Sequence, residues 1–469
     1  MVDLTGKRVT VMGLGQFGGG AGAVRFLLDH GAIVTLTDLR SAGELESSLA
    51  TIPVDQLGKL VLGEHREEDF RNTDLIVVNP AVKRDGNRFL DIAVQSGVEL
   101  TSEIALFWQH CPAKKIVVTG STGKSTTATL IHQFLLSARI PSRLGGNIGI
   151  SLLPEVTSLT PEDHVVLELS SFQLADLDRL QPKPDVAVVT NFFPNHLDWH
   201  GSLDQYREAK QSAIAYQSED QIAILNGDDA DCALWPTDAK VLWFGHEVWQ
   251  DRPGVHIGPK GIAVRSESGG WMVHPEDLSP ALRTPHGIQN VAAALAAVVV
   301  GMKIPIDRIA SALTEFQPLP HRFERVAEID GRIFIDDSKA TTPEATIAAL
   351  NSLSSPVLLI AGGKEKGVSL EPLADVIREK VKGAAFIGDT ASSLEKMVTS
   401  SPESPNRTLS SVTIAADLPT AVQWIWDHSA PGDVILLSPA CASHAEFLNY
   451  EHRGNRFREC IRSLTTPNE

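Results

Sequence analysis

Short apolar runs alternate along this chain with longer stretches in which apolar residues recur at helical spacing. Within residues 7–38, the strand-like run "KRVTVMGLG" leads into a helix expected to reach about His30, and Gly31 ends that helix before the next strand, "AIVTLTD". The same alternation restarts near "CPAKK" (111–115) and again after "QPLPHRFE" (317–324). Strands that alternate with helices predict an α/β fold with mostly parallel sheets.

The two restarts divide the chain into three segments, residues 1–112, 113–319 and 320–469. A chain of 469 residues is too long for one ordinary core, and about three domains of ~150 residues are expected. The polar, glycine-rich stretch 245–290 predicts short β elements and loops. The sequence therefore predicts three α/β domains.

Composition narrows the possible partners. The formal net charge of −17 disfavours nucleic acid, because such binding depends on clustered Lys and Arg that neutralise phosphates. The N-terminus lacks the apolar segment of a signal peptide, and the apolar run of 12 residues from Val291 suits a buried helix, since it is too short to cross a bilayer. The four cysteines show no metal-type spacing and are expected to be free, buried thiols: Cys111, Cys232, Cys441 and Cys460. These features predict a cytoplasmic protein with no membrane insertion.

A first glycine-rich loop follows the first predicted strand. The segment "GLGQFG" contains Gly13, Gly15 and Gly18, and Asp38 ends the next strand. This pattern is typical of dinucleotide sites, in which glycines allow close approach of phosphate and the acid binds a ribose hydroxyl. A nicotinamide site, and a sheet of the same fold that holds another nucleotide or none, fit this pattern equally well.

A second loop, in "VVTGSTGKSTTATL" (117–130), has the chemistry of a phosphate site. Gly123 and Lys124 precede Ser125, but the standard pattern places its first glycine at Val118, and the nearest one is Gly120. The loop is therefore shorter than usual. Backbone N–H groups before a helix still form a cradle for anions, and the serine hydroxyl suits Mg²⁺. A nucleotide site is favoured over a glycine-rich turn with a surface lysine.

Other polar residues become candidate site residues only because they lie at or after the ends of predicted strands. Glu168 ends the apolar strand in "VVLELSS", and His196 follows another strand in "TNFFPNHLDWH". Both occupy the end of the sheet where ligands bind, and Mg²⁺ prefers oxygen ligands. A helix-capping carboxylate and an ordinary loop histidine are the alternatives. Spacing alone predicts that Lys210, in "DQYREAK", is a solvated helix lysine.

The third segment has three cation-bearing loops, each of which follows a strand. Arg and Lys in such loops can bind a phosphate or a carboxylate. A single loop of this kind would be taken as charged surface, whereas three together indicate an edge that faces a ligand. Their residues are His321, Arg322, Asp336, Asp337, Lys339, Lys364 and Lys366.

In this order, the motifs resemble the Mur ligases over nearly the whole chain, and the shortened loop has the form usual in that family. The segments that carry the resemblance are "TGSTGKST" (119–126), "GGNIG" (145–149), "LELSSFQL" (167–174), "LPHRFE" (319–324), "DSKAT" (337–341) and "LLSPACAS" (436–443).

The resemblance implies a Rossmann-like N-terminal domain that holds the UDP part of the substrate instead of NAD. It also implies a central ATPase-like parallel sheet with the phosphate loop, and a mobile Rossmann-like C-terminal domain that holds D-glutamate. The implied enzyme is a monomeric, cytoplasmic ATP-dependent ligase of peptidoglycan precursor synthesis. It would add D-glutamate to UDP-N-acetylmuramoyl-L-alanine through an acyl phosphate, releasing ADP and phosphate.

The resemblance also implies roles for individual residues, including a carbamylated Lys210 that helps bind the second of two Mg²⁺ ions. The implied catalytic residues are Lys124, Glu168, His196 and Lys210. The implied metal-binding residues are Ser125, Glu168, His196 and Lys210. The implied ATP-binding residues are Gly120, Ser121, Thr122, Gly123, Lys124, Ser125, Thr126, Asn290, Arg322 and Asp337. The implied substrate-binding residues are Asp38, Arg40, Asn79, Asn147, His196, Lys339, Thr341, Lys366, Ser443 and Tyr450.

Three other functions remain possible from the sequence. The first glycine loop permits an NAD-dependent oxidoreductase, although the second loop argues against it. A non-catalytic protein regulated by nucleotide would bind ATP without turnover. Within the ligases, a sibling that adds a different amino acid is the main competitor.

Overall fold

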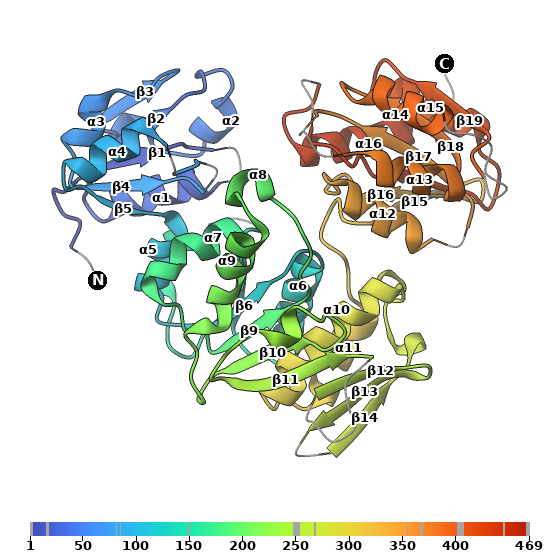
Figure 1. The fold of residues 1–469 in the computed structure, drawn as a ribbon, viewed down its shortest axis with the longest axis horizontal. Coiled ribbons are helices and arrows are strands. Elements are labelled where there is room, and N and C mark those ends of the chain that lie inside the picture. The colour runs from blue at the N-terminus through green and yellow to red at the C-terminus, as the bar shows by residue number, and fades with distance from the viewer. Residues whose placement is uncertain are drawn as a thin grey trace. The chain divides into compact units, whose positions relative to one another are not determined.

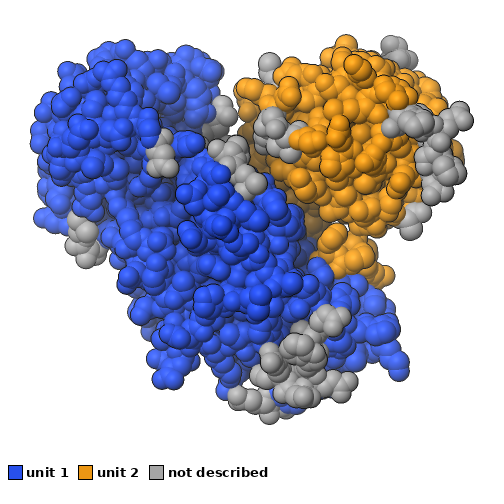
Figure 2. All heavy atoms as spheres, viewed as in Figure 1, with its two compact units in different colours: residues 1–279, 287–316 blue, residues 280–286, 317–469 orange. Residues whose placement is uncertain are grey.

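Three sheets organise the chain, and Figure 1 shows them in order from the N-terminus to the C-terminus. The computed structural model describes residues 3–15, 18–80, 82–84, 86–148, 151–246, 254–266, 269–353, 355–365, 369–400, 408–443 and 446–465. Two compact units contain these sheets. Unit 1 comprises residues 1–279 and 287–316, and unit 2 comprises residues 280–286 and 317–469 (Figure 2).

The first sheet of unit 1 has five parallel strands in the order β3-β2-β1-β4-β5. The strand order reverses between β1 and β4, and the loops after these two strands therefore lie where open sheets bind ligands. The strands are β1 (Arg8–Met12), β2 (Ile33–Asp38), β3 (Lys59–Leu62), β4 (Leu75–Val78) and β5 (Glu99–Thr101). The helices are α1 (Gly19–Asp29), α2 (Glu46–Leu49), α3 (Glu67–Arg71), α4 (Arg88–Gln95) and α5 (Glu103–His110).

The second sheet of unit 1 has nine strands in the order β14-β13-β12-β11-β10-β9-β6-β8-β7, and β13 pairs antiparallel with both of its neighbours, β12 and β14. The strands are β6 (Lys114–Thr119), β7 (Ser142–Gly146), β8 (His164–Glu168), β9 (Val186–Val189), β10 (Ile222–Asn226), β11 (Lys240–Gly245), β12 (Gly254–Gly258), β13 (Gly261–Ser266) and β14 (Gly269–Val273). The helices are α6 (Lys124–Ser137), α7 (Ser171–Leu177), α8 (Leu197–His200), α9 (Leu203–Ala215), α10 (Pro285–Leu295) and α11 (Ala310–Thr314).

The apolar run from Val291 is buried, as predicted. Helix α10 continues into a π-helical segment, η7 (Ala296–Gly301), and every residue from Val291 to Val300 is buried. Among the residues described, no helix is both long and apolar enough to cross a membrane. All four cysteines are buried and free, which confirms that prediction.

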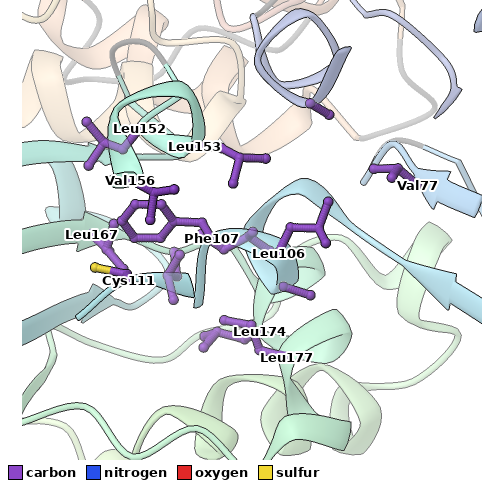
Figure 3. Close-up of a cluster of buried hydrophobic side chains, with 14 of the residues drawn as sticks. Val77, Leu106, Phe107, Cys111, Leu152, Leu153, Val156, Leu167, Leu174 and Leu177 are labelled. Atoms are coloured by element: carbon purple, nitrogen blue, oxygen red, sulfur yellow. The ribbon is translucent and has the colours of Figure 1, made fainter. Parts of the chain in front are cut away.

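One hydrophobic core joins the two sheets of unit 1. Helix α5, which follows the last strand of the first sheet, buries Phe107 in this core, and Figure 3 shows its ring close to Val156 of the 3-10 helix η2 (Leu153–Ser158). Leu167 of β8 and Leu174 of α7 belong to the same core. Because burial of apolar surface is the main favourable term in folding, these side chains stabilise both sheets together.

Unit 2 contains one six-stranded sheet in the order β15-β16-β20-β17-β18-β19, in which β15 is antiparallel to its neighbour and the other pairs are parallel. The strands are β15 (Glu324–Ile329), β16 (Arg332–Asp336), β17 (Val357–Gly362), β18 (Val381–Ile387), β19 (Ser411–Ile414) and β20 (Val434–Leu437). The helices are α12 (Pro343–Asn351), α13 (Glu371–Lys380), α14 (Ala391–Thr399), α15 (Leu418–His428) and α16 (Tyr450–Thr465).

Strand β17 shows why this sheet is covered on both faces. Leu358 and Ile360 pack into one hydrophobic core, whereas Leu359 and Ala361 pack into another. Successive side chains of a strand point to opposite faces, so a continuous apolar run requires helices on both sides. The α/β fold with mostly parallel sheets predicted from the sequence is confirmed.

Candidate active site

The shortened phosphate loop connects β6 directly to the first turn of α6. Gly123 has φ 78° and Gly120 has φ 142°, values that side chains other than glycine rarely adopt. A Cβ atom on Gly123 would lie 2.4 Å from Oδ1 of Asn290, and one on Gly120 would lie 1.9 Å from Oγ1 of Thr190. Both glycines are therefore required by the close packing of the loop, which leads into a helix N-terminus suited to an anion.

Two lysines meet at this loop. Nζ of Lys124 donates to the carbonyl oxygens of Gly120 and Ser121, each at 3.1 Å, and Nζ of Lys210 donates to the same Gly120 oxygen at 2.7 Å. Lys210 is only 2% exposed, so the solvated lysine that spacing alone predicted is wrong. Burial, followed by the charge of Lys124, lowers the pKa of Lys210 well below its usual value.

An oxygen-rich cluster lies at the end of β8. Ser125 donates its hydroxyl to Oε2 of Glu168, and Asn147 donates its amide to Oε1 at 2.8 Å. Strands β6 and β8 are parallel neighbours, so the loop and Glu168 meet at one edge of the sheet. No three His, Cys, Asp or Glu side chains group around a possible metal site in the described residues. A Mg²⁺ ion would fit here if the serine hydroxyl and phosphate oxygens completed its ligands.

His196 lies on the loop that leads into α8, with an unusual φ of 53°. Its ring is 4.9 Å from the ring of Phe172 and 6.5 Å from that of Tyr206, between ring centroids, and its side chain is exposed. Asn290 of α10 accepts a hydrogen bond from Oγ1 of Thr127 at 3.4 Å. The structure thus brings Asn290 beside the phosphate loop, where the resemblance places a nucleotide contact.

Two residues that the sequence analysis did not select also hold the loop. Oδ1 of Asn191 accepts from the backbone N–H groups of Ser121, at 3.1 Å, and Thr122, at 2.8 Å. The hydroxyl of Tyr206 lies 3.1 Å from that of Ser121. Glu168 is the last residue of β8 and Asn191 lies two residues beyond the end of β9, so both stand at the carboxyl end of the sheet, where ligands bind.

At the first glycine loop, Asp38 and Asn79 bind the backbone. Oδ2 of Asp38 accepts from the N–H groups of Leu14 at 2.9 Å and Gly15 at 3.5 Å, and Oδ1 accepts from the N–H of Arg40 at 3.0 Å. Nδ2 of Asn79 donates to the carbonyl of the loop's first glycine at 3.3 Å. These contacts fix the loop at the point where the strand order reverses.

In unit 2, Asp337 follows β16 and is buried. Its Oδ1 accepts from the N–H of Phe323 at 3.1 Å, and its Oδ2 accepts from the hydroxyl of Ser438 at 2.8 Å. Burial raises the pKa of Asp337 to about 7, and the positive charge of Arg322 opposes that shift. The hydrogen bonds from Ser438 and Phe323 oppose the shift more strongly than the charge of Arg322 does.

The residues expected to bind the amino acid also lie in unit 2. Nζ of Lys339 is 3.8 Å from the ring centroid of Tyr450, a cation–π contact. Thr341 is half-buried just before α12, and Ser443 follows Ala442, whose carbonyl accepts from the N–H of Lys364 at 2.9 Å. Lys366 lies outside the described residues.

Comparisons with known proteins bear on the family of this chain. Family models match residues 7–102 as "Mur ligase MurD-like, N-terminal domain", 118–298 as "Mur ligase middle domain" and 321–441 as "Mur ligase, glutamate ligase domain". A curated relative from Roseiflexus sp. (strain RS-1), named UDP-N-acetylmuramoylalanine–D-glutamate ligase, is 36% identical over 495 residues, which cover 99% of this chain and 100% of the relative. The chain belongs to the Mur ligase family.

Other Mur ligases extend this similarity. A relative of the same name from Koribacter versatilis is 36% identical and covers 99% of both chains. Among solved structures, the MurC ligase of Thermotoga maritima has a TM-score of 0.62 at 16% identity, over 98% of this chain and 100% of that one. The MurF ligase of the same organism, solved in complex with ADP, has a TM-score of 0.58 at 18% identity, over 99% and 97%. These structures share the fold of this Mur ligase.

Proposed function

We propose that this Mur ligase joins D-glutamate to UDP-N-acetylmuramoyl-L-alanine and converts ATP to ADP and phosphate. The reaction is the one that the names of its full-length relatives describe. The structural observation that carries the proposal is the convergence of Lys124 and Lys210 on the carbonyl of Gly120, next to the paired Ser125 and Glu168. This arrangement suits the transfer of a phosphoryl group to a carboxylate.

A carboxylate does not react with an amine at neutral pH because oxide would have to leave. Transfer of the γ-phosphoryl group to a carboxylate oxygen breaks the bond between the γ-phosphorus and the bridging oxygen, and ADP departs with that oxygen. The amine nitrogen of D-glutamate then forms a bond to the carbonyl carbon, inorganic phosphate leaves, and a proton passes to solvent. Catalysis of the first step depends mainly on positioning and on offsetting negative charge.

Different residues of unit 1 would bind the phosphates and offset their negative charge. Lys124 and the N-terminus of α6 offset the charge of the phosphates. Ser125 and Glu168, with His196, would hold Mg²⁺, which supplies further positive charge against the phosphate oxygens. We assign the ATP contacts to the loop residues 120–126 and to Asn290, with Arg322 and Asp337 of unit 2 as further nucleotide contacts.

We also propose that Lys210 is carbamylated. An amine with a lowered pKa is largely unprotonated, so its nitrogen lone pair can form a bond to the carbon of CO₂ while the N–H proton is lost to solvent. The product is a carbamate with two oxygens and a negative charge. That charge would pair with Lys124, and the oxygens would serve as ligands for a second Mg²⁺ ion.

Substrate binding would involve all three segments of the chain. We assign residues 1–112 to the UDP part of the substrate, 113–319 to ATP and Mg²⁺, and 320–469 to D-glutamate. The contacts proposed for the UDP substrate are Asp38, Arg40, Asn79, Asn147 and His196. Those proposed for D-glutamate are Lys339, Thr341, Lys366, Ser443 and Tyr450. The enzyme would act as a monomer on small molecules of the cytoplasm.

The test is phosphate release from ATP and Mg²⁺ in the presence of UDP-N-acetylmuramoyl-L-alanine, with D-glutamate, L-glutamate, L-alanine or meso-diaminopimelate in parallel. Release that requires both the UDP substrate and D-glutamate is the expected result. Release with a different amino acid would keep the ligase chemistry but refute the proposed specificity. If no amino acid gives release, the ligase proposal fails, and a nucleotide-regulated binding protein becomes the better interpretation.

A further inference from the structure

Asn191 bonds to the phosphate loop with both ends of its side-chain amide. Its Oδ1 accepts from the N–H groups of Ser121, at 3.1 Å, and Thr122, at 2.8 Å. Its Nδ2 donates to the hydroxyl and carbonyl oxygens of Thr122, at 3.2 and 3.3 Å. The main-chain oxygen of Asn191 accepts a further bond from the N–H of Ser121 at 3.0 Å. One residue of a neighbouring strand end thus fixes two consecutive loop residues.

The short loop explains why such support is needed. Only Ser121 and Thr122 separate Gly120 from Gly123, whereas four residues separate the glycines of the standard pattern. A loop with so few residues has few internal acceptors for its own N–H groups, and buried N–H groups need partners. Strand β9 supplies them, because it is the parallel neighbour of β6 and ends beside the loop.

The residue before Asn191 contributes to the same support. Oγ1 of Thr190 donates to the carbonyl of Thr122 at 2.5 Å and to that of Thr119 at 3.2 Å. The carbonyl of Thr122 therefore bonds to the end of β9, whereas the carbonyls of Gly120 and Ser121 accept from Lys124. Anions bind at such loops through N–H groups and at helix N-termini, so a fixed loop backbone favours phosphate binding.

We propose that Asn191 is a positioning residue for ATP. It fixes Ser121 and Thr122 so that the later N–H groups of the loop and the ammonium of Lys124 face the phosphates. The inference rests on the proposed function and deepens it, because it gives the shortened loop a partner outside the phosphate-loop motif. An amide is suited to this role, since it both accepts and donates without adding charge beside the phosphates.

Asn191 could instead block the place of a phosphate oxygen, and that arrangement predicts the opposite effect of its removal on ATP binding. If Oδ1 of Asn191 occupied the place of a phosphate oxygen, ATP would have to displace it, and removal of the side chain would strengthen ATP binding. If Asn191 instead holds the loop in its binding form, removal would weaken ATP binding. The direction of the change therefore decides between the two arrangements.

The experiment measures binding of Mg²⁺-ATP and Mg²⁺-ADP by titration calorimetry to the full chain and to Asn191→Ala, with steady-state KM values for all three substrates. Loss of several hydrogen bonds to the loop is expected to weaken nucleotide binding about tenfold. The KM for ATP should rise to a similar extent, and those for the UDP substrate and D-glutamate should stay within about twofold. Unchanged or tighter nucleotide binding would overturn the proposal.

Two further variants separate positioning from general damage. In Asn191→Asp, the Oδ1 acceptor remains but the Nδ2 donor to Thr122 is lost, and the added charge should weaken ATP binding about tenfold or more. Wild-type binding in this variant would contradict the inference. Gln217→Ala is the matched control, because Gln217 is buried and donates to the carbonyl of Pro184 at 2.9 Å, before β9 begins. It should lose thermal stability but keep its affinity for ATP.

The same binding data distinguish a failure of the proposed ligase function from a failure of the proposed role of Asn191. If the wild-type chain binds neither ATP nor ADP, the proposed function fails, and this inference fails with it. If the wild-type chain binds both nucleotides and Asn191→Ala binds them equally well, only the role of Asn191 is refuted.

Discussion

Lys124 and Lys210 donate to one atom, the carbonyl oxygen of Gly120, at 3.1 and 2.7 Å. Two ammonium groups that share an acceptor repel each other, and the repulsion is strongest away from water. Burial and the charge of Lys124 both disfavour the charged form of Lys210 and lower its pKa well below the usual value. Lys124 is only half-buried, so its ammonium is less desolvated than that of Lys210.

Replacement of Lys210 by Ala should reduce phosphate release more than a hundredfold, because the carbamate that we propose as a metal ligand can no longer form. Added acetate or formate should restore part of the activity, since a small carboxylate can enter the space. Lys210→Arg is the matched control: its guanidinium stays protonated and forms no carbamate. It should be inactive and should not respond to carboxylate. Full activity of Lys210→Ala would remove this lysine from the mechanism.

Replacement of Glu168 by Gln should raise the Mg²⁺ concentration needed for half-maximal activity about tenfold. The amide keeps hydrogen bonds to Ser125 and Asn147 but is a weaker ligand for a hard cation. A Mg²⁺ titration of the rate at saturating ATP measures this change. Glu162→Gln, which alters an exposed carboxylate before β8, serves as the control. An equal Mg²⁺ requirement in all three proteins would show that Glu168 does not bind the metal.

Replacement of Asp38 by Ala should raise the KM for the UDP substrate about tenfold and leave the KM for ATP nearly unchanged. The N–H groups of Leu14 and Gly15 would lose their carboxylate acceptor, so the first glycine loop would no longer be fixed. Steady-state kinetics with each substrate varied in turn will separate the two effects. A rise in the KM for ATP alone would show that this loop does not serve the UDP substrate.

Replacement of Asp337 by Asn should change how stability depends on pH. Burial raises the pKa of Asp337 to about 7 from an unfolded value of 3.8, so between about pH 4 and 7 the folded state keeps a proton that the unfolded state has lost. The free energy of unfolding therefore falls as pH rises through this window, by at most about 1.4 kcal/mol per pH unit. The full stabilisation is present only below the unfolded pKa.

Urea unfolding at pH 5 and pH 7 tests this prediction. Wild-type protein should lose more stability between these two values than Asp337→Asn, in which the titrating group is absent. The exposed Asp330, replaced by Asn, should behave like the wild type. The same pH dependence in all three proteins would show that Asp337 titrates normally in the folded chain.

The features that the sequence predicted correctly are local. A strand, a glycine-rich turn and a helix N-terminus are specified by neighbouring residues, so the phosphate loop at Gly120–Lys124 could be recognised from its own segment of the chain. The burial of the apolar run from Val291 could likewise be predicted from its own segment, because its composition alone requires burial. The α/β order follows from the alternation of apolar patterns along the chain.

The remaining features depend on which strands lie side by side. Lys210 is buried because α9 packs against α7 and beside β6, and spacing within one helix does not carry that information. The sequence did not predict a role for Asn191, because a single asparagine after a strand is neither charged nor part of a recognisable motif. Its role becomes visible only when β9 is known to pair with β6.

The core around Phe107 limits where this chain can be divided into fragments that fold. A fragment that ends at residue 112 would carry Phe107 on α5 without Val156, Leu167 and Leu174, and would expose a large apolar ring to water. An engineered exchange of the N-terminal segment between two Mur ligases meets the same obstacle. Chimaeras should fold when the contacting side chains from η2, β8 and α7 are transplanted together with the donor's α5, and should aggregate when the junction is cut by sequence position alone.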